Sequence, residues 1–215
     1  MDKQQAIFDT LYAEHPTLAP LANDLRAAFD TLLDSFARGG TLLLCGNGGS
    51  ACDCEHIAGE LMKGFLLPRK LSAPEAAALA AAGDDGTLAN TLQRALPTLV
   101  LHGLSGMSTA FMNDVNPALT FAQQAFAYAR AGDVLWCIST SGNALNVRLA
   151  AIAARARGAK VIGLTGETGG LLAVHCDVCI RAPQRETWRV QELHLPIYHA
   201  LCAALEAALY GEAEA

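Results

Sequence analysis

Short, almost wholly apolar runs recur along this chain and alternate with longer stretches whose apolar residues have helical spacing. The runs cover residues 41–45, 97–101, 134–138, 160–164 and 178–181. A strand that is buried on both faces lacks the polar alternation of a half-exposed strand. Helices between such strands return the chain to the same end of the sheet, so that the strands run parallel. The sequence therefore predicts an α/β fold: a three-layer, doubly wound sandwich in which helices cover both faces of a parallel sheet.

Helical periodicity outlines the rest of this sandwich. It predicts helices over residues 3–14, 20–38, 50–64, 105–112, 117–130, 144–157 and 186–210. The apolar stripe of the second helix (Leu21, Leu25, Phe29 and Leu32) is wide for a surface helix. Its simplest interpretation is packing on the chain's own sheet, and the alternative is contact with another subunit.

Residues 66–96 are the least regular part of the sequence. They contain Pro68, Pro74 and an alanine-rich stretch, and they predict short helices on a surface excursion. Neither an internal repeat nor a linker divides the chain. We therefore expect a single domain over residues 1–215, with N-terminal helices over about residues 1–38.

The composition argues against several classes of partner. A net charge of -6 gives no general attraction for nucleic acid or an anionic membrane, and no apolar run is long enough to predict a membrane span. The seven cysteines are odd in number and partly lie in apolar runs, as reduced thiols do in the cytoplasm. A four-thiolate zinc site is not expected, because Cys52 and Cys54 diverge on a helix and Cys176 and Cys179 should point to opposite faces of a strand.

A glycine-rich corner, within CGNGGSACDCEHIAGE at residues 45–60, joins the first strand to a helix. Because Ser50 opens that helix, its N-terminus and the exposed backbone N–H groups of the corner favour an anion. Ser50 and Asp53 also have the spacing of a capping box. His56 and Glu60, four residues apart, project from one side of the helix, within reach of one metal ion or one substrate.

A second polar corner follows the third strand. It places three consecutive hydroxyls before a helix N-terminus: Ser139, Thr140 and Ser141. Together these groups can donate to three phosphate oxygens without a Lys or Arg. A helix cap would need only one hydroxyl, so the run of three favours a phosphate site.

Nucleotide binding is the competing interpretation of the first corner, because residues 46–51 match G-x-G-x-x-A after a strand. That fingerprint also needs an acidic residue about 20 positions later, at the end of the next strand. The residues near that position are Leu66-Leu67-Pro68-Arg69, and the next strand ends at Leu101-His102. The sequence also lacks a G-x-x-x-x-G-K-[ST] loop. We therefore do not expect a nucleotide.

The chain resembles the sugar isomerase (SIS) domain family and, within it, the phosphoheptose isomerases. The resemblance rests on GNGGSACDCEHIAGEL, Asn113-Asp114, ISTSGN, LTGETGG and RVQELHLPIYH, in this order and spacing, and spans nearly the whole chain from residue 20. It implies a five-stranded parallel sheet in a homotetramer with sites at subunit interfaces. It also implies interconversion of sedoheptulose 7-phosphate and D-glycero-D-manno-heptose 7-phosphate.

The resemblance also implies roles for individual residues. Sugar-binding residues would be Asn47, Gly48, Gly49, Ser50, Asn113 and Asp114, and the phosphate would be held by Ser139, Thr140 and Ser141. The matches to zinc ligands are His56, Glu60, Gln191 and His199, of which Glu60 and His199 also form the acid/base pair. Glu60 and Gln191 would contact the substrate as well. Zinc, one ion per subunit, is thus the implied cofactor, and other divalent metals suit the same ligands.

Three points remain open in the sequence. His194, three residues from Gln191, competes with His199 on geometric grounds. Ala144 stands where the family usually has a further serine, and Trp188 stands where enterobacterial-type members have an aspartate. The alternatives to the isomerase are a tetrameric adaptor that binds a replication initiator, and an isomerase or sensor for another phosphosugar.

Overall fold

A computed structural model describes residues 3–211. Its sheet is five-stranded, with all strand pairs parallel and the order β2-β1-β3-β4-β5. The strands are β1 (Leu42–Cys45), β2 (Thr98–Val100), β3 (Val134–Ser139), β4 (Lys160–Gly166) and β5 (Val178–Ala182). The predicted parallel sheet is confirmed, and each strand lies within about two residues of the expected run.

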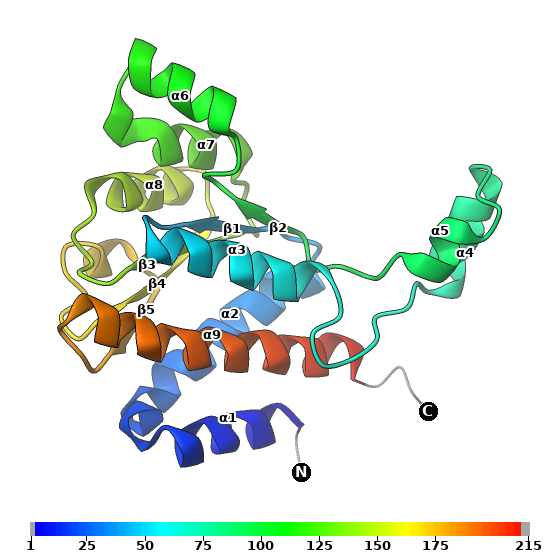
Figure 1. Ribbon diagram of the computed structural model, residues 1–215, viewed down its shortest axis with the longest axis horizontal. Coiled ribbons are helices and arrows are strands. Elements are labelled where there is room, and N and C mark those ends of the chain that lie inside the picture. Colours follow the sequence, from blue (N-terminus) through cyan, green and yellow to red (C-terminus); the bar gives the residue numbers. More distant parts are fainter. Residues whose placement is uncertain (1–2, 212–215) are drawn as a thin grey trace.

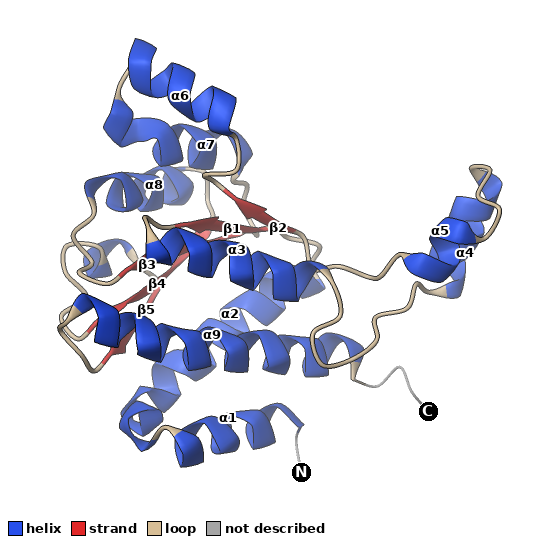
Figure 2. Cartoon of the chain, in the orientation of Figure 1, coloured by secondary structure: helices blue, strands red, loops and turns tan. Residues whose placement is uncertain are grey.

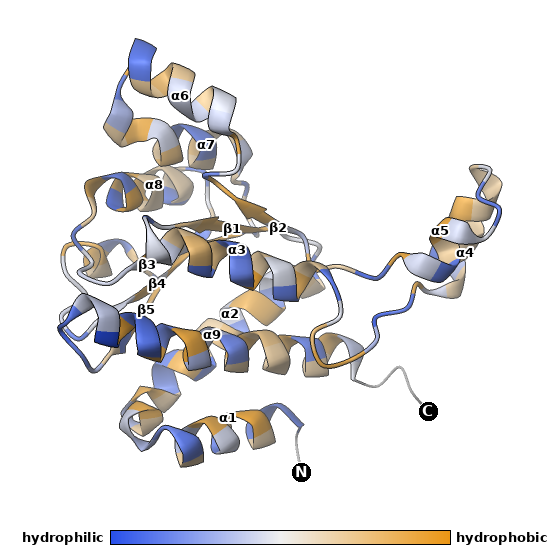
Figure 3. Ribbon diagram, in the orientation of Figure 1, coloured by the Kyte–Doolittle hydropathy of each residue, from blue (hydrophilic) through white to orange (hydrophobic). Residues whose placement is uncertain are grey.

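Helices cover both faces of the sheet (Figures 1 and 2). Leu42 and Leu44 of β1 belong to one apolar core, whereas Leu43 and Cys45 belong to the other. This arrangement explains why the run is apolar at every position. The first core is closed by α2 (Ala22–Ala37), α3 (Gly49–Met62) and α9 (Thr187–Tyr210), and the second by α7 (Thr120–Tyr128) and α8 (Leu145–Ala156). Figure 3 shows the strands as hydrophobic segments between these layers.

The N-terminal region differs in detail from the prediction. Helix α1 (Lys3–Glu14) is as expected, but the second expected helix starts later, because the 3-10 helix η1 (Pro16–Leu21) contains Pro20 and precedes α2. The apolar stripe from Leu21 to Leu32 is buried in the chain's own core. It therefore gives no support to a subunit contact.

The excursion forms an arm of two short helices, α4 (Ala73–Ala81) and α5 (Thr87–Thr91), which projects from the body (Figure 1). Every residue of both helices is at least partly exposed. The base of the arm is firmly attached, because Arg94 N–H donates to the Arg69 carbonyl at 2.7 Å and Leu96 N–H donates to the Leu61 carbonyl at 2.9 Å. Lys70 and Gln93 form an antiparallel bridge at the same place.

Two further helix boundaries moved. Helix α6 (Ser105–Asp114) includes the expected Asn-Asp end, and residues 117–130 divide into the 3-10 helix η2 (Pro117–Leu119) and α7. A short 3-10 helix, η3 (Ala173–His175), precedes β5. None of the helices formed by residues 3–211 combines the length and apolar character that crossing a membrane requires.

Candidate active site

The glycine-rich corner turns β1 into α3 with Gly48 as the N-cap residue, at φ 55°. The predicted capping box is therefore wrong: Ser50 lies inside the first turn and is buried. A side chain at Gly46 would collide with the backbone of Ser50, at 2.6 Å from its carbonyl oxygen. The corner can close this tightly because its glycines lack side chains.

The hydroxyl corner lies at the end of the neighbouring strand, β3, which pairs with β1. Thr140 and Ser141 line a cavity of about 400 Å³, whereas Ser139 is buried beside it. Gly142 has φ 65°, and its carbonyl accepts a hydrogen bond from Leu172 N–H at 2.9 Å. The N-cap of α8 is Ala144, whose methyl group cannot accept a hydrogen bond, so this helix end has no hydroxyl cap of its own.

A pair of amides joins the two corners. Asn47 Nδ2 donates to Asn146 Oδ1 at 2.9 Å, and Asn146 Nδ2 donates to Asn47 Oδ1 at 2.8 Å. The two corners thus meet at the carboxyl edge of the sheet, where ligands of open α/β sheets bind.

His56, Glu60 and His199 come together where α3 packs along α9. His56 Nε2 lies 3.3 Å from Glu60 Oε1 and 3.3 Å from His199 Nε2. Lys63 Nζ lies 3.0 Å from the other carboxylate oxygen of Glu60. Burial, and then the nearby His56, lower the pKa of His199, which favours its neutral form.

Tyr198 completes this cluster, and its role was missed from the sequence. Its hydroxyl lies 3.0 Å from His56 Nδ1 and 3.4 Å from Asp53 Oδ1. This contact leaves Nε2 of His56 facing Glu60 and His199. The available signal was the spacing of seven residues between Gln191 and Tyr198, which places both on one side of α9.

The donor spacing of the cluster fits a metal ion. Zinc holds nitrogen and oxygen ligands at about 2.0–2.1 Å in a tetrahedron, so neighbouring donor atoms are about 3.3 Å apart. The two distances from His56 Nε2 have this value. Within residues 3–211, however, no three or more His, Cys, Asp and Glu side chains are already arranged as a metal-binding group.

The structure does not bring all predicted residues to this cluster. Gln191 lies against the start of α3, where a side chain on Gly49 would meet its amide nitrogen. Asn113 and Asp114 are exposed at the end of α6, where Asn113 Nδ2 donates to Asp114 Oδ1 at 2.8 Å. Their proximity to the substrate stays a prediction.

Known proteins resemble the chain over most of its length. The model of the SIS domain matches residues 15–77 and 71–166. A phosphoheptose isomerase of Thiobacillus denitrificans is 42% identical over 85% of the chain and 82% of that protein, and one of Roseiflexus sp. is 34% identical over 99% and 94%. The solved phosphoheptose isomerase GmhA of Neisseria gonorrhoeae superposes with a TM-score of 0.73 at 30% identity, over 94% of this chain and 96% of that one.

The chain belongs to the SIS domain family. Within that family it belongs with the phosphoheptose isomerases.

The two candidate histidines of α9 have different surroundings in this SIS domain. His194 is fully buried, with Nε2 3.3 Å from the Thr165 carbonyl at the sheet, and burial lowers its pKa to about 4. His199 instead faces His56. Although Pro196 lies between the two histidines, α9 continues without a break to Tyr210.

The hydroxyl corner of this SIS domain also contains a cation that was not predicted from the sequence. Arg185 lines the same cavity as Thr140 and Ser141, and its guanidinium forms an ion pair with Glu167, which also lines the cavity. Arg185 follows β5 in a loop, where a lone arginine is most often a solvated surface residue.

Trp188, at the start of α9, is exposed.

Proposed function

We propose that the protein is an aldose–ketose isomerase that interconverts sedoheptulose 7-phosphate and D-glycero-D-manno-heptose 7-phosphate. The observation that carries the proposal is the convergence of Glu60 of α3 and His199 of α9 on His56 Nε2, which lies 3.3 Å from each of them. The names of the similar proteins support the choice of substrate.

The sugar phosphate is expected to lie along α3. Its phosphate binds at the hydroxyl corner, with Thr140 and Ser141 lining the cavity and Ser139 behind them. Gln191 lies against Gly49, at the start of α3. His56 is seven residues further along the same helix, and the helical rise places it about 10 Å from Gly49. An extended seven-carbon chain with a terminal phosphate has a comparable length. Asn47, Gly48, Gly49, Ser50 and Gln191 then face its middle, and we assign Asn113 and Asp114 to its remaining hydroxyls.

The reaction moves a carbonyl group between C2 and C1 through an enediolate. Glu60 removes the carbon-bound proton as general base, and His199 exchanges a proton with the substrate oxygens as the acid partner. Lys63, at 3.0 Å, keeps the Glu60 carboxylate oriented. His56, Glu60, Gln191 and His199 are the residues we assign to a zinc ion, which would polarise the carbonyl group.

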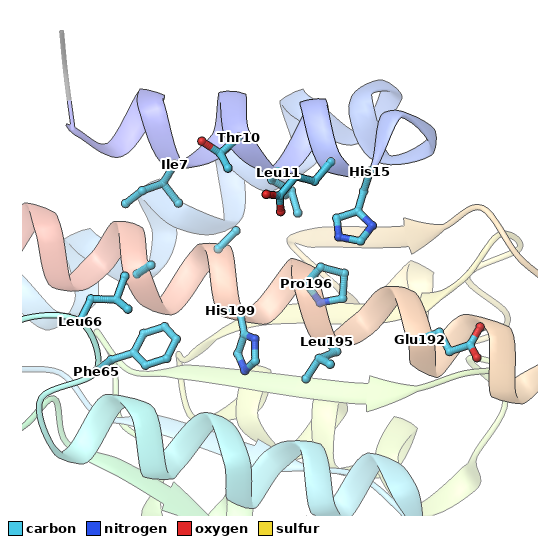
Figure 4. A pocket seen from close by; sticks show the side chains of 13 residues that line it. Ile7, Thr10, Leu11, His15, Phe65, Leu66, Glu192, Leu195, Pro196 and His199 are labelled. Atoms are coloured by element: carbon cyan, nitrogen blue, oxygen red, sulfur yellow. The ribbon is translucent and has the colours of Figure 1, made fainter.

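We infer that the enzyme is a cytoplasmic homotetramer with its sites at subunit interfaces. His199 lines an apolar groove of about 520 Å³ between α1 and α9, together with Phe65, Leu66 and Leu195 (Figure 4). Leu66 is 64% exposed and Leu195 41% exposed beside the proposed acid/base pair. A second copy that covered this groove would exclude water from the site. Light scattering at micromolar concentration tests the assembly, and a monomer mass contradicts it.

The activity is tested by incubating zinc-loaded protein with five-, six- and seven-carbon ketose phosphates in deuterated water. We expect exchange at the carbon beside the carbonyl group of sedoheptulose 7-phosphate. Exchange with shorter sugars only would indicate another phosphosugar isomerase. If metal-replete protein exchanges none of them, the adaptor function is the better explanation.

Two matched variants locate the base. Glu60→Gln should slow exchange about 100- to 10,000-fold, because the amide cannot accept the proton. Glu55→Gln makes the same change on the same helix at a 66% exposed side chain that contacts His102, and should leave the rate within about twofold. Metal content is measured in both variants. Equal rates in the two variants would remove Glu60 from the role of base.

A further inference from the structure

The thiols of Cys176 and Cys179 lie side by side in the structure. Cys176 and Cys179 were expected on opposite faces of a strand, which is wrong because Cys176 precedes β5, directly after η3. Both sulfur atoms lie over Gly163 of β4, at 2.7 Å and 3.4 Å from the point that a Cβ there would occupy. The missing side chain of Gly163 thus provides the space that the two sulfur atoms occupy.

The pair is accessible to small molecules. Both thiols are partly exposed, whereas Cys45, Cys54, Cys137 and Cys202 are buried. They line a cavity of about 480 Å³ together with Asp24, Asp177 and Arg181. Asp177 is turned toward β4, where Lys160 Nζ lies 2.9 Å from its carboxylate and Val161 N–H donates to it at 2.8 Å. Arg181 is therefore the charged group on the same face of β5 as Cys179.

The surroundings favour ionisation at one of the two sulfur atoms. The neighbouring Cys176 thiol lowers the pKa of Cys179, and Arg181 and Thr165 lower it further. The pKa of Cys176 is raised in turn, by its thiol partner and by burial. Of the two thiols, Cys179 therefore ionises more readily than Cys176.

The thiol pair is connected to the proposed phosphate corner through one short segment. Cys176 Sγ donates to the Leu172 carbonyl at 3.4 Å, and Leu172 N–H donates to the Gly142 carbonyl at 2.9 Å. Arg181 lies across Gly169, and Gly169 in turn lies against Gly142. A movement of the thiols would therefore shift the backbone between Ser141 and Ala144 through these contacts.

We propose that Cys176 and Cys179 form a thiol-modification site that reacts with low-molecular-weight disulfides and lowers substrate binding when oxidised. The Cys179 thiolate attacks a disulfide RSSR, forming a mixed disulfide and releasing one RS⁻. The Cys176 sulfur, as it loses its proton, then attacks the Cys179 sulfur, forms a Cys176–Cys179 disulfide and releases the second thiol. Two protein thiols are oxidised and one RSSR is reduced to two RSH. Oxidation removes the S–H group that donates to Leu172.

The thiol chemistry is tested without reference to catalysis, with glutathione disulfide as the probe and peptide mapping by mass spectrometry. We expect a Cys176–Cys179 disulfide in Cys52→Ser protein, in which the exposed competing thiol is absent. Cys176→Ser should hold glutathione at Cys179, and Cys179→Ser should leave Cys176 unmodified. An adduct at Cys52 of the unmodified protein while Cys176 and Cys179 both stay reduced overturns the proposal.

A kinetic measurement on the unmodified chain needs no variant. An ordinary thiol with a pKa near 8.5 is only about 3% thiolate at pH 7. We expect iodoacetamide to alkylate Cys179 at least about tenfold faster than Cys52 in the same molecule at that pH. Faster reaction at Cys52 contradicts the assignment of Cys179 as the attacking thiol.

The effect on substrate binding rests on the proposed function. Oxidised protein should show a KM for sedoheptulose 7-phosphate raised about 2- to 10-fold, the effect of losing one hydrogen bond, with recovery after reduction. An unchanged KM in fully oxidised protein overturns the coupling. Absence of turnover in reduced, metal-replete protein would instead reject the isomerase function, while the thiol measurements remain interpretable.

Discussion

Replacing Glu206 with Gln should destabilise the protein more than any other single charge removal proposed here. Glu206 and Arg69 form an ion pair of 2.7 Å, and both side chains are fully buried. The same carboxylate accepts hydrogen bonds from the backbone N–H groups of Phe65, Leu66 and Leu67, at 2.6–2.9 Å. Glu206 therefore holds the segment that follows α3.

The magnitude follows from what the substitution leaves behind. In Glu206→Gln the Arg69 charge stays buried without a counter-charge, and one carboxylate oxygen becomes an NH₂ group that faces N–H donors. Breaking a buried ion pair by removing one partner typically costs about 3–5 kcal/mol. For a chain of this length each kcal/mol lowers Tm by about 2–4 °C, so we expect a fall of about 6 to 20 °C.

Catalysis should suffer as well, because Arg69 donates to the carbonyls of Leu61, at 2.6 Å, and Glu60, at 3.1 Å. The buried pair thus fixes the end of α3 that carries the proposed base. Differential scanning calorimetry and kcat, measured well below the lowered Tm, report the two effects separately. The surface variant Asp30→Asn is the control, since Asp30 and Arg26 are each 51% exposed and such pairs contribute at most about 1 kcal/mol.

A fall in Tm no larger than that of Asp30→Asn would refute this reasoning. The double variant Arg69→Met with Glu206→Gln sharpens the test, because it removes the uncompensated Arg69 charge while the amide still offers an oxygen to the backbone N–H groups of the segment after α3. It should recover much of the stability that Glu206→Gln loses. If the double variant is as unstable as the single one, the packing of the segment and not the uncompensated charge accounts for the loss.

His56→Ala should lose bound zinc, measured by metal analysis after zinc loading; equal, near-zero content in both proteins would reject the metal site. The pKa of His194 is about 4 when folded, against an ordinary value near 6.5, so the unfolded chain binds this proton first. Stability should therefore fall by about 3 kcal/mol as the pH drops from 6.5 to 4, and denaturant titrations of His194→Gln should show a smaller fall. Gly142→Ala should weaken phosphate binding, because its Cβ would lie 2.1 Å from the Gly169 carbonyl oxygen, whereas Gly132→Ala adds a similar backbone strain in open space and should leave binding unchanged.

The sequence was sufficient to predict the layers of the fold. A strand that is buried on both faces, such as β3, can be recognised from the sequence because its residues from Val134 to Ile138 are all apolar. The placement of the two corners at the carboxyl ends of strands followed from this pattern, whereas the strand order β2-β1-β3-β4-β5 was not predicted. The helix boundaries were predicted less accurately. Pro20 and Pro117 lie in 3-10 helices, whereas hydrophobic periodicity predicted that the following α-helices would include these residues.

Contacts between distant segments could not be read from local patterns. Asn47 and Asn146 are 99 positions apart, and nothing in either neighbourhood specifies the other. The thiol pair was misjudged because strand alternation was applied to Cys176, which lies before the strand. The placement of Tyr198 against His56 depends on how α9 packs along α3, which only the three-dimensional structure determines.

The bridge between Lys70 and Gln93 has a consequence for engineering. The chain leaves the body and returns to it at one point, so residues 71–92 behave as a cassette whose two ends are already paired. A two-residue type I′ turn such as Asn-Gly connects antiparallel neighbours of this kind. Excision of the cassette would leave Arg69, Glu206 and the main-chain bonds of Arg94 and Leu96 in place. We expect the same junction to accept a reporter or an affinity module without displacing α3 or α9.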